Sequence, residues 1–253
     1  MYKYNIVILS IIVIILITFI FTYSESYCGN LRLNIKSFNT GKSKKLVIIS
    51  GVHGNEYAPP IGVSNFISQH INNFDKYNYH IVFIPRVNEE GLIQKRRHLP
   101  CKSTITYNHD INRNFYTETE KILDETSLEK QIINIIQDAD FVLDFHEAYD
   151  FHILKPSSIG TTISISNTGL PLNMASLLVN GINETIPDNN KKFTILSIDE
   201  YNIPHTLRDY CEKKGIHYNL VEITGQNNKQ PLNIRVNQTL KILNTLFDNI
   251  SII

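Results

Sequence analysis

The sequence lacks tryptophan, internal repeats, long low-complexity segments and any excess of charge, since it has 24 basic and 24 acidic side chains. Without a basic excess, the composition gives no support for nucleic acid or an acidic surface as a partner. We attribute the missing tryptophan and the many asparagines and isoleucines to coding bias. The length of 253 residues suits one large domain plus an additional segment.

Cysteine is scarce, with only Cys28, Cys101 and Cys211 in the chain. None of them forms a CxxC pair, which argues against a zinc site built from thiolates. In an oxidising compartment two of the three can form a disulfide and one is left over. The sequence does not indicate which two would pair.

Charge is missing altogether from residues 6–22, "IVILSIIVIILITFIFT", and the first acid after them is Glu25. A membrane-spanning helix needs about 20 mainly apolar residues, whereas the core of a signal peptide has roughly 7 to 15. This run lies between the two lengths and nearer to the first. We therefore expect residues 5–22 to form a membrane anchor; a signal peptide cleaved near the small residues 24–26 is the alternative.

Either interpretation places the remainder of the chain outside the cytosol, as an anchored or a secreted domain. Three glycosylation sequons, at Asn183, Asn237 and Asn249, agree with this location. We therefore divide the chain into an anchor or signal segment, residues 1–27, and a single catalytic domain, residues 28–253.

Apolar runs and helical spacing alternate along this domain. Strands are predicted at 45–50, 79–85, 141–149 and 216–225, and helices at 59–74, 117–140, 204–215 and 231–250. Residues 30–45 are typical of a lead-in hairpin or linker, residues 86–116 of a loop, and residues 150–203 show no clear pattern up to the helix at 204. The alternation predicts an α/β fold with a mixed, largely parallel central sheet flanked by helices.

Polar side chains occur where three of the predicted strands end, namely His53, His146 and Glu222. In α/β sheets, binding sites form beyond the carboxyl ends of the strands. Three such residues at one edge of a sheet exceed what composition alone would give, so we expect them to lie close together.

His53 and Glu56 offer an imidazole and a carboxylate in one short loop. A catalytic zinc site uses three protein ligands of this kind and keeps one position open. His146 is the best candidate for the third ligand, and Asp144 lies on the same face of its strand, where it can support a ligand from behind. The alternative is a solvated loop histidine with a glutamate that caps a helix.

Glu222 lies near the end of the apolar run "LVEITG". A buried acid is costly unless it is paired or functional. A zinc hydrolase needs a carboxylate that takes a proton from the metal-bound water, and Glu222 is the candidate for this general base. A buried glutamate in a salt bridge is the alternative.

Asn112 and Arg113 are adjacent in a polar loop before a predicted helix. The planar guanidinium of arginine matches a carboxylate through two hydrogen bonds. A carboxylate-bearing substrate is therefore one interpretation of this pair. A surface arginine beside an asparagine that caps a helix is the other.

Five motifs in this order resemble the zinc carboxypeptidase superfamily: "GVHGNE" (51–56), "RVNEEG" (86–91), "DINRNF" (110–115), "FVLDFHE" (141–147) and "LVEITG" (220–225). The "HGNE" form and the compact size are most similar to its succinylglutamate desuccinylase/aspartoacylase branch, while "DINRNFY" is equally similar to the peptidase branches. The resemblance covers roughly residues 44–247, and five motifs in order are specific although each alone is weak.

The resemblance implies one zinc ion held by His53, Glu56 and His146. It implies that Glu222 activates the water and then protonates the leaving amine. It also implies that Asn112 and Arg113 grip the terminal carboxylate of the substrate.

Two further arginine positions follow from the resemblance. Arg96 or Arg97 matches the arginine that polarises the scissile carbonyl, and the sequence does not choose between them. Arg208 matches the arginine that aspartoacylases use for an acyl-side carboxylate, but its distance of 14 residues to Glu222 is longer than that pattern expects.

The sequence thus predicts a zinc-dependent amide hydrolase of the desuccinylase/aspartoacylase type, which releases an amino acid with a free carboxylate from a small N-acyl amino acid. A carboxypeptidase that acts on peptide C-termini or cell-wall peptides is the alternative, and the expected anchor favours it over a cytosolic metabolite enzyme. A membrane-anchored binding protein without catalysis on the same scaffold is the second alternative.

Overall fold

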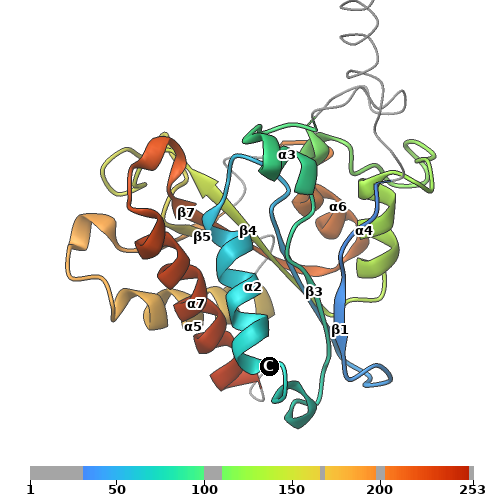
Figure 1. Ribbon diagram of the computed structural model, residues 1–253, viewed down its shortest axis with the longest axis horizontal. Helices are drawn as coiled ribbons and strands as arrows, with labels where there is room; N and C mark the ends of the chain where they lie inside the picture. Colours follow the sequence, from blue (N-terminus) through green and yellow to red (C-terminus); the bar gives the residue numbers. More distant parts are fainter. Residues whose placement is uncertain (1–30, 100–109, 166–168, 198–202, 251–253) are drawn as a thin grey trace, which may run out of the picture.

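A seven-stranded sheet forms the centre of the molecule in the computed structural model, which describes residues 31–99, 110–165, 169–197 and 203–250 (Figure 1). The strand order is β1-β3-β2-β4-β7-β5-β6. The strands are β1 (Lys36–Phe38), β2 (Lys45–Ser50), β3 (His80–Ile84), β4 (Phe141–Ala148), β5 (Thr162–Ile165), β6 (Thr194–Ser197) and β7 (His217–Thr224). The helices are α2 (Ala58–His70), α3 (Glu89–Gln94), α4 (Leu128–Ile136), α5 (Leu170–Asn183), α6 (Leu207–Lys214) and α7 (Leu232–Asn249). Short 3₁₀ helices are η1 (Phe74–Lys76), η2 (Ile111–Arg113), η3 (Asn189–Lys191) and η5 (Gln226–Asn228).

The four central strands, β3, β2, β4 and β7, run parallel to one another. The antiparallel pairs lie toward the edges, where β1 pairs with β3 and β5 pairs with β7, while β6 is parallel to β5. The predicted α/β fold with a mixed, largely parallel sheet is therefore confirmed. Because β2, β4 and β7 are parallel neighbours, the loops that follow them meet at one edge of the sheet.

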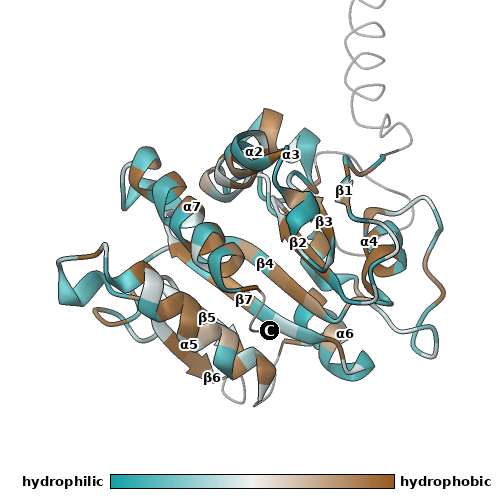
Figure 2. Cartoon of the chain, turned by 90° about the horizontal axis from the view of Figure 1, so that it is seen from below, coloured by the Kyte–Doolittle hydropathy of each residue, from teal (hydrophilic) through white to brown (hydrophobic). Residues whose placement is uncertain are grey.

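Two buried cores lie on the two faces of the sheet. Alternate residues of β4 supply them, since Phe145 packs with α2, α5 and α7, and Val142 packs with α4 and α6. Figure 2 shows α7 and α6 on either side of β7, with largely hydrophobic strands between the helices. This alternation fixes which side chains of each strand face α6, and the candidate site lies on that side.

One predicted helix is much shorter in the structure than in the prediction, because α4 covers only Leu128–Ile136 of the predicted range 117–140. The Ser127 side chain caps the helix by accepting a hydrogen bond from the amide of Lys130 at 3.2 Å. Before it, side chains bind nearby amides instead, as where Glu120 accepts from the Thr117 amide at 2.8 Å. Such local bonds compete with helix formation, so the acids and threonines of this segment form turns.

The segment without a clear pattern, residues 150–203, contains β5, α5, η3 and β6. Both strands have only four residues, and β6 is half-exposed, so neither gives a strong periodic signal. The predicted linker at 30–45 contains β1, which adds an antiparallel edge strand, and the predicted loop at 86–116 contains α3 and η2.

The expected anchor at residues 5–22, Cys28 and Cys101 lie outside the described residues. Within the described residues, no helix is long and apolar enough to cross a membrane. Cys211 is a buried free thiol. The side chain of Asn183 in the first sequon makes two hydrogen bonds to the backbone. Its Nδ2 donates to the carbonyl of Phe193 at 2.9 Å, and its Oδ1 accepts from the amide of Phe193 at 2.7 Å.

Candidate active site

The three predicted metal ligands lie together at the carboxyl edge of the sheet. The loop after β2 carries His53 and Glu56, and β4 carries His146. Gly54 lets this loop pack tightly against the 91–97 segment, since a Cβ at Gly54 would lie 2.1 Å from the carbonyl carbon of Gly91. The edge therefore gathers the predicted ligands in the way that a parallel sheet dictates.

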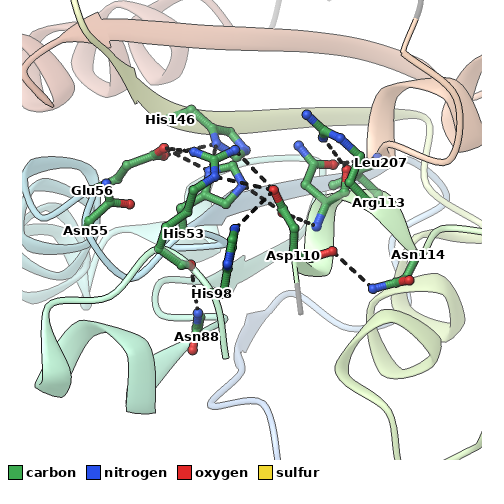
Figure 3. A network of polar contacts seen from close by, with 12 residues as sticks. His53, Asn55, Glu56, Asn88, His98, Asp110, Arg113, Asn114, His146 and Leu207 are labelled. Carbon is green, nitrogen blue, oxygen red and sulfur yellow. Dashed lines mark hydrogen bonds and ion pairs between the residues drawn. The ribbon is translucent and has the colours of Figure 1, made fainter. Parts of the chain in front are cut away.

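The two imidazoles and the Glu56 carboxylate converge on one point (Figure 3). His53 Nδ1 lies 2.8 Å from Glu56 Oε1, and His146 Nδ1 lies 3.0 Å from Glu56 Oε2. The two Nδ1 atoms are 3.0 Å apart. All three side chains are at most 3% exposed. The three potential ligand atoms lie within 4.8 Å of one another, which is compact enough to surround one metal ion.

A second layer of carboxylates holds the far side of each imidazole. His53 Nε2 lies 3.1 Å from Asp110 Oδ1, and His146 Nε2 lies 3.2 Å from Asp144 Oδ2. The hydroxyl of Tyr218 also donates to Asp144, at 2.9 Å. Carboxylates that bind the outer nitrogen fix the orientation of a metal-ligating histidine. The predicted supporting role of Asp144 is thus matched by geometry, and Asp110 plays the same part for His53.

The charges of this cluster fit a divalent cation. Burial alone would raise the pKa of Glu56, but the charges of His53 and His146 outweigh burial and hold this pKa well below its usual range. Burial opposes a charge on His146 too, yet Asp144 and Glu56 raise its pKa well above the usual value. The buried acids thus demand positive charge at the point where the ligand atoms converge, and a metal ion would supply it.

Glu56 is held from several directions beyond the two histidines. Its Oε1 accepts from Arg97 Nη1 at 3.3 Å and from Gln226 Nε2 at 3.2 Å. Its Oε2 accepts from the backbone amide of Glu147 at 3.1 Å. Gln226 was missed by the sequence reasoning, although it directly follows the "LVEITG" motif. These bonds leave Glu56 little freedom to turn away from the two imidazoles.

Glu222 is the direct neighbour of His146 across the β4–β7 pair. Both residues project on the face of the sheet that α6 covers. Glu222 is four positions from Tyr218 and His146 is four positions from Val142, so each pair shares a face, and Tyr218 and Val142 pack on that side. Burial raises the pKa of Glu222 to about 8, against the charge of His146 and with the help of Glu56 and Asp144. A cation at the ligand cluster would favour its charged form.

The structure distinguishes the two arginines that the sequence left open. Arg97 lines the pocket and bonds Asp110 through Nε and Nη2, at 3.3 and 3.2 Å, in addition to Glu56. Arg96 is exposed and is not among the lining residues. Arg97 is therefore the one that can reach a bound substrate.

Asn112 and Arg113 lie in η2 and line the pocket. Asn112 Oδ1 accepts from the amide of Leu207 at 2.9 Å and so ties this turn to the start of α6. Arg208 follows in the same helix and also lines the pocket. Burial lowers the pKa of Arg208, and the charge of Arg113 lowers it further. The bond between Asn112 and Leu207 joins the neighbours of these two arginines, so their segments adjoin at the pocket wall.

These residues open into one cavity of about 660 Å³. Its wall continues from the ligand cluster along β7, β5 and β6, through Tyr218, Leu220, Ser164 and Leu196. At its other end are the loop after β4 and the segment after β7, with Tyr149, Asp150, Lys155, Ser157, Ser158, Asn227 and Lys229. The site is thus part of a larger pocket and is not an isolated surface cluster.

A comparison with known protein families matches part of the chain. Residues 42–152 match the succinylglutamate desuccinylase/aspartoacylase catalytic domain. The resemblance seen in the five motifs is thereby confirmed. Among zinc carboxypeptidase-like proteins, the chain is similar to the succinylglutamate desuccinylase/aspartoacylase branch. The match includes the candidate metal ligands and ends before Arg208 and Glu222. A comparison with curated protein sequences finds no match.

Solved structures share the fold at low sequence identity. The cell shape determinant Csd4 from Helicobacter pylori is 15% identical with a TM-score of 0.69, over 88% of this chain and 55% of that one. A candidate metallopeptidase from Shewanella amazonensis SB2B is 21% identical with a TM-score of 0.59, over 86% of this chain and 82% of that one. This chain therefore spans about half the length of Csd4, and these likenesses concern the fold alone.

Proposed function

We propose that the protein is a zinc-dependent amide hydrolase that releases an amino acid with a free carboxylate from the end of a peptide. The size of the cavity is the observation that carries this proposal, because the ligand cluster forms only part of its wall and many further residues line it. A volume of about 660 Å³ is typical of sites for drug-sized ligands, so it accommodates more than one residue.

The activity and ligands of one structural relative support a peptide substrate. Csd4 is described as a D,L-carboxypeptidase, and its structures include tripeptide-bound and mDAP-bound forms. A peptide from the cell wall also suits a domain that an apolar N-terminal segment would hold outside the cytosol. We therefore place peptides of this kind first among the substrates to be tested.

His53, Glu56 and His146 would hold the zinc ion, which supplies a Lewis acid and a water of lowered pKa when bound. Glu222 projects from β7 next to His146, where its carboxylate can take a proton from the attacking water and return it to the leaving nitrogen. Its burial excludes bulk water from this proton transfer. Asp110 and Asp144 keep the imidazoles oriented during turnover.

The arginines would bind the substrate on the other side of the reacting bond. Arg113 and Arg208, together with Asn112, would hold the carboxylate of the residue that is released. Arg97 has five N–H groups, of which the described hydrogen bonds use three. The remaining two can stabilise negative charge on the carbonyl oxygen.

Hydrolysis of an N-acyl amino acid is the second candidate function. The family match favours it, because the succinylglutamate desuccinylase/aspartoacylase catalytic domain covers the segment with all three candidate ligands. A small substrate of this kind would use the arginine end of the cavity and leave the other end empty. The two candidates therefore differ in how much of the cavity the substrate fills.

Metal analysis and a substrate panel test both candidates on the full-length protein, kept in detergent because of residues 6–22. We expect about one zinc ion per chain, loss of activity after chelation, and recovery when zinc is added. Release of C-terminal residues from peptides would support the first candidate, and hydrolysis of N-acyl amino acids alone would support the second. A folded protein that binds no divalent metal would contradict both and favour the non-catalytic alternative.

We also propose that residues 5–22 anchor the protein in a membrane with the catalytic domain on the non-cytosolic side. The uncharged apolar run supports this proposal. Carbonate extraction of membranes should leave the protein in the pellet, with an intact N-terminus by peptide mass. Release of a protein that begins near residue 27 would support the secreted alternative.

A further inference from the structure

The end of the cavity that faces away from the arginines has no part in the mechanism above. Residues of the loop 149–159 line it, together with Asn227 and Lys229. Hydrogen bonds link the candidate metal ligands to the segments that carry both ends. On the lysine side, Gln226 lies three residues before Lys229 and donates to Glu56. On the arginine side, Asp110 lies three residues before Arg113 and contacts His53, on the ring nitrogen that faces away from Glu56.

Internal hydrogen bonds hold the loop 149–159 in a defined shape. The hydroxyl of Ser158 accepts from the amide of Asp150 at 3.0 Å and donates to its carbonyl at 2.9 Å. His152 Nδ1 lies 2.7 Å from the carbonyl of Ser158. A Cβ at Gly160 would lie 2.4 Å from Thr224 Oγ1, so the loop packs closely against the end of β7. A loop fixed in this way presents its side chains to the cavity without a large ordering cost.

Two ammonium groups and one carboxylate face each other at this end. Lys155 Nζ lies 3.0 Å from Asp150 Oδ2, and Lys229 Nζ lies 2.9 Å from Asp150 Oδ1. Two positive charges and one negative charge leave a net charge of +1. The lysine side chains are 61% and 53% exposed, whereas that of Asp150 is 20% exposed. Each ammonium has three N–H donors, so both can bind a further acceptor while they keep Asp150.

Arg208 does not contribute to this end of the cavity, where the positive charge comes from two lysines. The motif resemblance suggested Arg208 for an acyl-side carboxylate, but the amide of Leu207 binds the turn that carries Arg113, so Arg208 lies at that turn. The positive charge on the other side of the ligand cluster comes from Lys155 and Lys229 instead. An anionic group on the acyl side of the substrate would therefore meet these two lysines.

We propose that Lys155 and Lys229 form an anion-binding subsite, so that the favoured substrate is a peptide with a carboxylate on the residue upstream of the released one. This inference rests on the proposed peptidase function. It assigns the two ends of the cavity to two carboxylates of one substrate, one on each side of the reacting bond. Asp150 holds one ammonium group at each of its carboxylate oxygens, and so it positions both lysines for the upstream carboxylate.

Matched peptides test the subsite on the zinc-loaded full-length protein. The pair is acetyl-Ala-Glu-Ala and acetyl-Ala-Gln-Ala, each offered with either configuration at its last two residues. Because each exposed charge pair is worth about 1.4- to 5-fold, we expect two of them to make the wild type favour the glutamate peptide by about 2- to 30-fold in kcat/KM. The preference should fall as salt is added, since salt screens exposed charges.

Variants assign the preference to the two lysines. The double variant Lys155→Ala/Lys229→Ala should hydrolyse both peptides equally, and the double variant Lys155→Arg/Lys229→Arg should keep the preference because it keeps the charge. Lys241→Ala is the matched control, since Lys241 is paired with Glu184 outside the cavity lining. An unchanged preference in the double alanine variant would overturn the subsite while the peptidase function stands.

A binding measurement separates failure of the subsite from failure of the proposed function. Calorimetry on the zinc-loaded Glu222→Gln variant measures the affinity for both peptides without turnover. Tighter binding of the glutamate peptide, lost with the double alanine substitution, would support the subsite even if the wild type hydrolyses neither peptide. Equal binding of the two peptides would overturn it whether or not hydrolysis occurs.

Discussion

The two halves of the chain contribute to the pocket in different ways. Residues 42–152 supply the three candidate metal ligands and the carboxylates behind them, all at most 6% exposed. Residues 153–250 supply Glu222 and half of the groups placed to contact a substrate, and the side chains of Lys155 and Lys229 are more than half exposed. The candidate metal centre is therefore a buried unit, and the surrounding pocket is a more open surface that can vary without disturbing it.

The difference predicts two classes of variant. Changes to the ligands and to the carboxylates behind them should remove the metal and all activity together. Changes to Glu222 or to the groups placed to contact a substrate should leave the metal in place and alter turnover or selectivity. Substitutions that cross this division, in either direction, are the most informative tests.

The largest effect is expected for His146→Ala, which removes a ligand and leaves Asp144 buried without the imidazole. We expect loss of bound zinc by mass spectrometry and loss of all detectable hydrolysis. His217→Ala, at the opposite end of β7 from Glu222, is a matched histidine control and should keep one metal per chain. Full metal content in the His146 variant would remove this residue from the ligand set.

Glu222→Gln should separate chemistry from metal binding. The substitution keeps the shape of the side chain and removes the proton acceptor, so we expect unchanged zinc content and a fall in kcat of about 10²–10⁴-fold. Metal analysis and steady-state kinetics on the same preparation would measure both quantities. A variant that keeps full activity would show that another group takes the proton.

The fold and the metal centre could be predicted because their physical signals are local in sequence. Apolar runs marked the four parallel strands, and strand ends marked His53, His146 and Glu222. The outer residues could not be found in this way, because Gln226 reaches Glu56 across 170 positions and Asp110 reaches His53 across 57. Their partners are set by the packing of loops, which a short sequence window does not contain.

The 117–140 segment shows the limit of periodicity for local structure. Its acids and threonines fit the start of a helix, but Thr117, Glu120 and Asp124 use their side chains in turns. The choice between Arg96 and Arg97 likewise depended on geometry, since adjacent residues point in different directions. Loop 149–159 gave no clear signal, because its single lysine, Lys155, belongs to no spacing that indicates a site.

A buried acid in the first half predicts a pH dependence of stability. Glu129 in α4 accepts from Asn114 at 3.2 Å, and Asn114 also bonds the carbonyl of Asp110 at 3.0 Å. Burial raises the pKa of Glu129 to about 7, from an ordinary value of 4.5. Between these two values the folded protein holds a proton that the unfolded chain releases, so stability should fall as the pH rises through this window.

Glu129→Gln should remove that decline. At pH 8 the variant should be more stable than the wild type by up to roughly 3 kcal/mol, since one pKa unit corresponds to about 1.4 kcal/mol. Urea unfolding at pH 5 and pH 8 would measure the difference. Glu125→Gln, at an exposed carboxylate just before the same helix, is the control and should follow the wild type. A wild-type stability that rises from pH 5 to pH 8 in step with the Gln variant would contradict the assignment.

The smallest of these effects is expected for Gln226→Ala, which crosses the division between the two halves. Gln226 belongs to the second half but donates to Glu56 at 3.2 Å, and its Oε1 accepts from Asn55 at 3.3 Å. It therefore acts on the metal through Glu56 and not on the substrate. Residues behind a metal ligand typically contribute 10- to 100-fold in metal affinity or activity, so we expect weaker zinc binding in this range.

Competition with a metal-binding dye would measure the zinc affinity of Gln226→Ala, and kinetics at saturating zinc would measure turnover. Activity should return toward the wild-type level when zinc is in excess, because the substrate contacts are unchanged. Gln131→Ala, the same substitution on the surface helix α4, should bind zinc normally. A variant with normal zinc affinity and a raised KM would instead place Gln226 among the substrate contacts, and it would then belong to the variable pocket and not to the metal centre.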